Sequence, residues 1–160
     1  MNEKELIPQL FKTEYRKIIS VLCKLFGIVN IEIAEDITND TFLLASETWG
    51  LKGIPENPTA WLYLVAKNKT KDYYKRHKTF SEKIVADFKH HQEQSEEIDV
   101  DLSIENITDS QLQMIFAICH SIIPLEAQTG LALKILCGFG IDAIAEAFLT
   151  NKETINKRLF

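Results

Sequence analysis

KELIPQLFKTEYRKIISVLCKLF, residues 4–26, is the stretch that decides the fold class. Its apolar residues recur every three to four positions, which is the spacing of an amphipathic helix. They are Leu6, Ile7, Leu10, Phe11, Tyr15, Ile18, Ile19, Leu22, Leu25 and Phe26. Gly27 ends the run, and Pro8 fits only if it lies near the first turn. No segment alternates β-branched with polar residues between turn signals, so the chain is predicted to be all-α.

The remaining helices follow from the same spacing and from turn residues. Residues 31–49 form a second helix, whose buried face is predicted to hold Ile33, Ile37, Thr41, Leu44 and Ala45. Residues 50–58 read as a loop, with Asn57 capping a third helix that starts at Pro58. Further helices are predicted over residues 58–76 with a weaker extension to about residue 90, 110–123, 124–138, 141–148 and 151–160. In the helix capped by Asp109 or Ser110, the expected inward residues are Leu112, Ile115, Phe116, Cys119 and Ile122.

Charge is distributed unevenly over the 160 residues, whose formal net charge is −5. Residues 57–91 carry +5, whereas residues 92–110 carry −7 and contain no lysine or arginine. The acidic stretch lacks aromatic residues and is predicted to be a linker. The predicted organisation is two small helical bundles, residues 1–91 and 111–160, joined by an acidic linker over residues 92–110.

Composition excludes several classes of protein. The three cysteines, Cys23, Cys119 and Cys137, are widely spaced, which argues against a disulfide framework and favours a reducing compartment. No signal peptide is visible, and no apolar run approaches the roughly 20 residues that span a bilayer. We therefore expect a cytoplasmic protein without membrane association.

The C-terminal residues 138–160, GFGIDAIAEAFLTNKETINKRLF, have the pattern of a helix-turn-helix. Ile144, Ala145 and Phe148 would face Ile155 and Leu159 across a tight turn capped by Thr150 or Asn151. The second helix would then offer donors to the major groove of DNA. These are Lys152, Thr154, Asn156, Lys157 and Arg158. An ordinary helical hairpin is the alternative interpretation.

The third predicted helix, WLYLVAKNKTKDYYKRHK, is basic and contains aromatic residues. Lys67, Lys71, Lys75 and Lys78 share one face, and Tyr74 lies near them. Cations neutralise phosphates and rings stack on unpaired bases, so the pattern is typical of single-strand binding. A solvated charged face is the alternative, and Trp61 is more often a core residue than a base platform.

The second predicted helix carries an acidic patch in AEDITNDTF, where Asp36, Asn39 and Asp40 fall on one face. Paired carboxylates could act as general acid and base or bind a divalent metal, but neither role has its further ligands nearby. A protein-docking patch is the better interpretation. Because no phosphate-binding loop, HExxH motif or nucleophile–histidine pair occurs, we predict no enzyme activity, catalytic residue, metal or cofactor.

AEDITNDTF, then NPTAWLYLVAKNKTKDYYKR, then the terminal helix-turn-helix, together resemble bacterial RNA polymerase sigma factors of the extracytoplasmic-function group. Matches in order and spacing are Trp61, Leu62, Ala66, Asn68 and Asp72. PENPTAWL and LQMIFAICHSIIPLEAQTGLALKILCGFG further resemble the subgroup with a C-terminal tetratricopeptide-like extension. The family continues beyond Phe160 with Arg- and Lys-rich residues, so we expect a truncated chain.

The resemblance implies a role for each matching segment. It places Asp36, Asn39 and Asp40 on the β′ clamp of core RNA polymerase. It assigns the −10 promoter element to Asn57, Trp61, Asn68, Lys69, Lys71, Lys75 and Arg76, and the −35 element to Lys152, Thr154, Asn156, Lys157 and Arg158. The implied function is promoter recognition, −10 melting and transcription initiation, with an anti-sigma protein or a fused regulatory domain as further partners. A stand-alone helix-turn-helix regulator is the alternative function.

Overall fold

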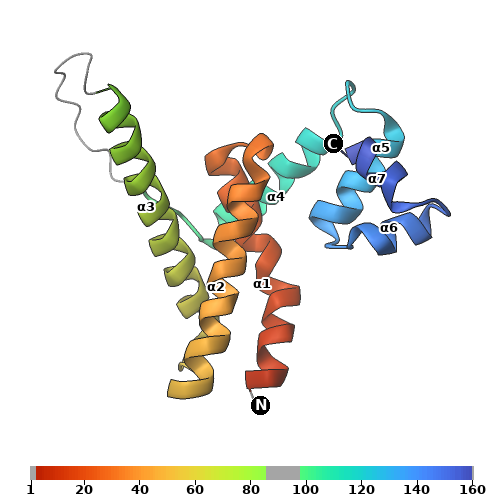
Figure 1. Ribbon diagram of the computed structural model, residues 1–160. Coiled ribbons are helices and arrows are strands. Elements are labelled where there is room, and N and C mark those ends of the chain that lie inside the picture. The colour runs from red at the N-terminus through yellow and green to blue at the C-terminus, as the bar shows by residue number, and fades with distance from the viewer. Residues whose placement is uncertain (1–2, 86–97, 160) are drawn as a thin grey trace.

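The computed structural model describes residues 3–85 and 98–159, which are almost wholly helical (Figure 1). Three long helices come first: α1 (Glu3–Phe26), α2 (Ile31–Lys52) and α3 (Pro58–Val85), with the short turn η1 (Ile28–Asn30) between α1 and α2. After α4 (Ile104–Ile118) follow α5 (Leu125–Leu131), the π-helical turn η2 (Ala132–Leu136), α6 (Ile141–Ala147) and α7 (Lys152–Leu159). No strand occurs in the described ranges, and the all-α prediction is confirmed.

Local signals set the ends of the long helices. Gly27 ends α1 with a φ of 85°, a conformation that residues with a Cβ rarely adopt. The Asn57 side chain accepts a hydrogen bond from the Ala60 amide at 3.0 Å, which confirms it as the cap of α3. Because α1 already begins at Glu3, Pro8 lies in its second turn rather than its first.

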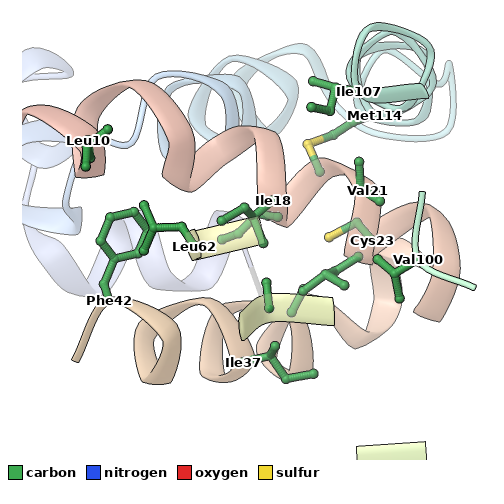
Figure 2. Packing of buried hydrophobic residues seen from close by; sticks show 14 of the residues in the cluster. Leu10, Ile18, Val21, Cys23, Ile37, Phe42, Leu62, Val100, Ile107 and Met114 are labelled. Carbon is green, nitrogen blue, oxygen red and sulfur yellow. The ribbon is translucent and has the colours of Figure 1, made fainter. Parts of the chain in front are cut away.

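One core joins α1, α2, α3 and α4 (Figure 2). Ile18 and Leu22 of α1 and Leu62 of α3 are fully buried at its centre. Burying each such side chain stabilises the fold by about 1.5–3 kcal/mol. Figure 2 shows Ile107 and Met114 of α4 reaching the same core from the far side of α1.

Small threonines let α2 and α3 pack closely. Thr38, Thr41 and Thr70 are fully buried, and each hydroxyl donates to the carbonyl oxygen four residues earlier, at 2.7–2.8 Å. No polar atom of these side chains is therefore left without a partner.

The predicted face of α2 is wrong at Leu44, which is exposed, and it missed the buried Phe42. Bulk alone does not decide which residues lie inward.

α4 corrects two predictions. It begins at Ile104, because the Ser103 hydroxyl caps it by accepting from the Asn106 amide at 3.3 Å. The predicted cap at Asp109 or Ser110 is wrong, and residues 104–110 of the predicted linker are helical. The predicted inward face is wrong too: the buried residues are Ile107, Ser110, Met114 and Ile118, whereas Leu112, Ile115, Phe116, Cys119 and Ile122 are exposed.

The C-terminal helices form a second, smaller core. Ile144 and Ala145 of α6 pack on Ile155 of α7, with Phe148 and Leu159 beside them, as the helix-turn-helix pattern predicts. Asn151 caps α7 by accepting a hydrogen bond from the Thr154 amide at 2.8 Å. The predicted domain boundary at residue 111 falls inside α4, and α4 packs mainly on α1 of the first core. The division of the chain into two domains stays a prediction.

Candidate functional site

The acidic patch lies on the exposed surface of α2. Asp36, Asn39 and Asp40 are all exposed, and helical spacing places them on one face. The Tyr15 hydroxyl of α1 donates to Asn39 Oδ1 at 2.8 Å. Burial, together with the charge of Glu35, raises the pKa of Tyr15 to about 12, so its hydroxyl keeps its proton at neutral pH. The patch is therefore held against α1 by one neutral hydrogen bond.

Lys69 belongs partly to the acidic patch. Its Nζ atom lies 3.6 Å from Asp40 Oδ2, across a cleft between α2 and α3. The cleft is lined by acidic, basic and apolar or aromatic residues: Ile33, Asp36, Ile37, Asp40, Lys69, Asp72, Tyr73 and Arg76. Arg76 also donates to the main-chain oxygen of Asp72 at 3.4 Å. Two of the cations predicted to hold DNA thus line this cleft, and one of them, Lys69, is paired with a carboxylate.

The lysines of the predicted basic face on α3 differ in how exposed they are. Lys75 and Lys78 are exposed, whereas Lys67 and Lys71 are half-buried. Lys67 Nζ lies 2.5 Å from the Asp99 carboxylate, a contact that the sequence did not predict. The row is therefore open to solvent at one end and covered by an acidic residue at the other.

Aromatic rings accompany this row. Tyr74 stacks on Phe26 with ring centres 5.1 Å apart and planes 10° from parallel, and Tyr73 packs on His77 at 4.2 Å. Partial burial raises the pKa of Tyr74. Offset aromatic contacts of this kind stabilise the α1–α3 interface. Tyr74 thus packs against α1, and its stacking on unpaired bases stays a prediction.

The three residues implied in base capture differ in the exposure and the contacts of their side chains. Asn68 is exposed on α3. Asn57 uses its side-chain oxygen as a helix cap. Trp61 is half-buried and meets Trp49 edge-on, with ring centres 5.3 Å apart. Of these residues, Asn68 is the one whose side chain is most available to a ligand.

Trp49 was not singled out from the sequence. It is 2% exposed, and its indole N–H has no hydrogen-bond partner among the described residues. A tryptophan just before Gly50 in a loop-rich stretch was the signal that could have found it. The predicted loop over residues 50–58 is wrong at its start, because α2 continues to Lys52. Together with Trp61, Trp49 packs the last turns of α2 against the core.

On α7, some of the predicted DNA-reading residues form contacts within the protein and others are exposed. Lys152 forms an ion pair with Asp142 of α6, and Arg158 with Glu126 of α5 at 3.1 Å. The Thr154 hydroxyl donates to Asn151 at 2.8 Å. Asn156 and Lys157 are exposed. Two of the three cations of this helix are therefore paired within the C-terminal unit.

Neither metal-binding clusters nor membrane spans were found in the described parts of the chain. No three His, Cys, Asp or Glu side chains converge there in a way that could hold a metal ion. Among the helices of residues 3–85 and 98–159, none is long and apolar enough to cross a bilayer.

Comparison with known proteins gives one family match and one relative. Residues 10–80 match the family Sigma-70 region 2, which covers α1 from Leu10, α2 and most of α3. An uncharacterized protein of Rhizobium meliloti (strain 1021) is 26% identical over 134 residues, which are 81% of this chain and 31% of that protein. The chain thus spans about a third of the length of that relative. No solved structure matches the chain. The family match is to region 2 alone and covers less than half of the chain, from α1 through most of α3.

Proposed function

We propose that this chain is a sigma factor of the extracytoplasmic-function group. It binds core RNA polymerase and directs promoter recognition, −10 melting and transcription initiation. One observation carries the proposal: the 10–80 match spans both the exposed acidic patch of α2 and the row of cations on α3. A sigma factor needs both surfaces, one for the polymerase and one for DNA. The proposed compartment is the cytoplasm, where polymerase and promoter are found.

The acidic patch is the proposed contact with the β′ clamp of the polymerase. Asp36 is exposed, so its charge is available to a basic partner. Asp40 is partly neutralised by Lys69, and an exposed pair of this kind is weak enough to exchange for a new cationic partner. Complementary charge of this type guides association and fixes orientation.

The proposed contacts with DNA are divided between α3 and α7. Asn57, Trp61 and Asn68 would capture an unstacked base of the −10 element, while Lys69, Lys71, Lys75 and Arg76 hold its backbone. Lys152, Thr154, Asn156, Lys157 and Arg158 would read the −35 element from α7. Since Lys152 and Arg158 are paired internally, contact with DNA there requires exchange of these ion pairs.

Capture of core polymerase on the immobilised full chain tests the proposal. We expect Asp36→Lys to reduce capture at least about tenfold, because a repulsive contact replaces an attractive one at a charged interface. Glu32→Lys is the matched control, since Glu32 is exposed on the same helix and its substitution changes the charge equally. Equal capture by the wild type and Asp36→Lys would contradict the docking role. No capture by the wild type would contradict the proposed function.

A stand-alone helix-turn-helix regulator is the second candidate. The packing of Ile144 and Ala145 on Ile155 favours it, because α6 and α7 have the arrangement that the motif needs. Such a regulator would bind duplex DNA without the polymerase and would leave the acidic patch without a role. Gel-shift titrations with and without core polymerase separate the two. The same titrations, with candidate anti-sigma proteins added, would show whether such a partner exists.

A further inference from the structure

Residues 98–102, which precede α4, pack against the first core. Ile98, Val100 and Leu102 pack on that core, and Val100 is 3% exposed. Figure 2 shows Val100 beside Cys23 of α1. Asp99 and Asp101 alternate with these apolar residues and are exposed. Because packed and exposed residues alternate along this segment, the apolar anchors fix the positions of the two carboxylates.

Asp99 faces the basic row of α3. Its Oδ1 atom lies 2.5 Å from Lys67 Nζ. Hydrogen bonding to Lys67 and the charge of that lysine lower the pKa of Asp99, with a smaller contribution from Lys71. Lys67 and Lys71 are one helical turn apart on the same face. One carboxylate therefore acts on both cations.

This arrangement is the one expected of a DNA phosphate on α3. A phosphate oxygen and a carboxylate oxygen are both charged acceptors that bind an ammonium group at similar distances. Two further contacts hold the downstream chain in place: Lys24 of α1 donates to Asn106 at 2.9 Å and to Asp109 at 2.7 Å. The carboxylate is thus presented by a fixed segment rather than by a free side chain alone.

We propose that residues 98–102 compete with single-stranded DNA for α3, with Asp99 occupying the place of a backbone phosphate on Lys67 and Lys71. The inference rests on the proposed function, since it takes α3 to be the surface that binds the melted strand. The Asp99 side chain is 75% exposed, so the pair is weak and a strand with several phosphates displaces it. The contact therefore lowers the affinity for short single strands, whereas a longer promoter strand with several phosphate contacts still binds.

Fluorescence anisotropy with a labelled single-stranded oligonucleotide of about 16 nucleotides tests the competition on the full chain. We expect Asp99→Asn to raise affinity about two- to fivefold at low salt, as expected for release of one exposed ion pair. Glu105→Gln is the matched control: Glu105 is exposed on the first turn of α4, and its substitution changes the net charge equally. Its affinity should equal that of the wild type.

A second comparison identifies the partner of Asp99. In a Lys67→Ala background, Asp99→Asn should raise affinity by a smaller factor, because only Lys71 is then released. Thermal unfolding followed by circular dichroism verifies that all variants are folded. Equal gains from Asp99→Asn and Glu105→Gln would overturn the inference, since net charge alone would explain them.

The remaining outcomes separate the inference from the proposed function. If the wild type binds and Asp99→Asn binds equally well, the competition is overturned and the DNA-binding role of α3 survives. If none of the proteins binds the oligonucleotide, both the competition and the DNA-binding role of α3 are overturned. Capture of core polymerase then still decides the docking role of α2.

Discussion

The Tyr63 hydroxyl of α3 donates a 2.6 Å hydrogen bond to the Glu14 carboxylate of α1. Glu14 is 7% exposed and also lies 3.0 Å from Lys17 Nζ. Burial by itself raises the pKa of Glu14, but the hydrogen bonds from Tyr63 and Lys17 outweigh it and lower the pKa below 4.5. The bond therefore ties α1 to α3, the helix that carries the proposed contacts with the −10 element.

Tyr63→Phe should destabilise the fold by about 1.5 kcal/mol, the cost typical of losing a hydrogen bond to a charged group. Because the folded pKa of Glu14 lies below its unfolded value, the stability that the carboxylate contributes is present above pH 4.5. That contribution is lost as the pH falls through the folded pKa. The deficit of the variant should accordingly be largest near neutral pH and shrink toward about pH 3. Urea unfolding at both pH values measures it.

Tyr73→Phe is the control for the loss of a phenol, since no hydrogen bond from Tyr73 to a carboxylate occurs in the described residues. Its stability should change by less than about 0.5 kcal/mol at either pH. A pH-independent deficit for Tyr63→Phe would show that the carboxylate is not its energetic partner.

Arg16→Ala should loosen the attachment of the C-terminal helices. Arg16 on α1 donates to the main-chain oxygen of Leu136 at 2.7 Å and also to that of Cys137, at the end of η2. A cation at a helix C-terminus is stabilising, and the loss should be about 1 kcal/mol. Hydrogen exchange measures it directly, because amides of residues 132–138 should exchange faster in the variant.

Lys12→Ala provides the comparison for Arg16→Ala, because Lys12 is exposed one turn earlier on α1. Exchange over residues 132–138 should stay at the wild-type rate in this variant. The same protection in Arg16→Ala would mean that apolar packing alone holds the two units together. Gly138 is adjacent to this contact, and any Cβ there would collide with the Arg16 guanidinium.

Met114→Ala should cost about 2–3 kcal/mol, whereas the larger truncation Phe116→Ala should cost less than about 0.5 kcal/mol. Met114 is 5% exposed against α1, and Phe116 is 74% exposed. Urea denaturation of the two variants compares them. A greater loss at Phe116 would place the other face of α4 inward, as the sequence pattern suggested.

α4 shows where pattern reading reaches its limit. Both of its faces are apolar, and the sequence pattern predicts the face with Leu112, Ile115 and Phe116 to be buried. The structure buries the face with Ser110, whose hydroxyl donates to the Asn106 carbonyl at 2.6 Å. A small, internally bonded residue permits close approach to α1, and this advantage is absent from a count of apolar side chains. In α1 the single apolar stripe predicts the buried Leu10, Ile18, Ile19 and Leu22 correctly. It is wrong at Phe11 and Leu25, which are exposed, and it misses the buried Val21 and Cys23.

The candidate site was predictable within each helix but not between helices. Spacing alone brings Asp36, Asn39 and Asp40 together, because residues three and four apart share a face. The Asp40–Lys69 and Lys67–Asp99 pairs join segments about 30 residues apart, and only the packing of the core decides them. Surface ion pairs are too weak to impose that packing, so they follow from it.

Asn68→Ala and Lys71→Ala should affect DNA binding in different ways. An exposed amide can hydrogen-bond to the edge of an unstacked base, so Asn68→Ala should weaken binding to a single strand about fivefold and leave duplex binding unchanged. Phosphates are present in both forms, so Lys71→Ala should weaken both and reduce the salt dependence by about one unit of slope. Lys4→Ala, an exposed lysine near the start of α1, is the control and should change neither affinity. Anisotropy titrations over a range of salt concentrations measure all three variants. Equal losses on the two DNA forms for Asn68→Ala would contradict base capture and leave α3 as a purely electrostatic surface.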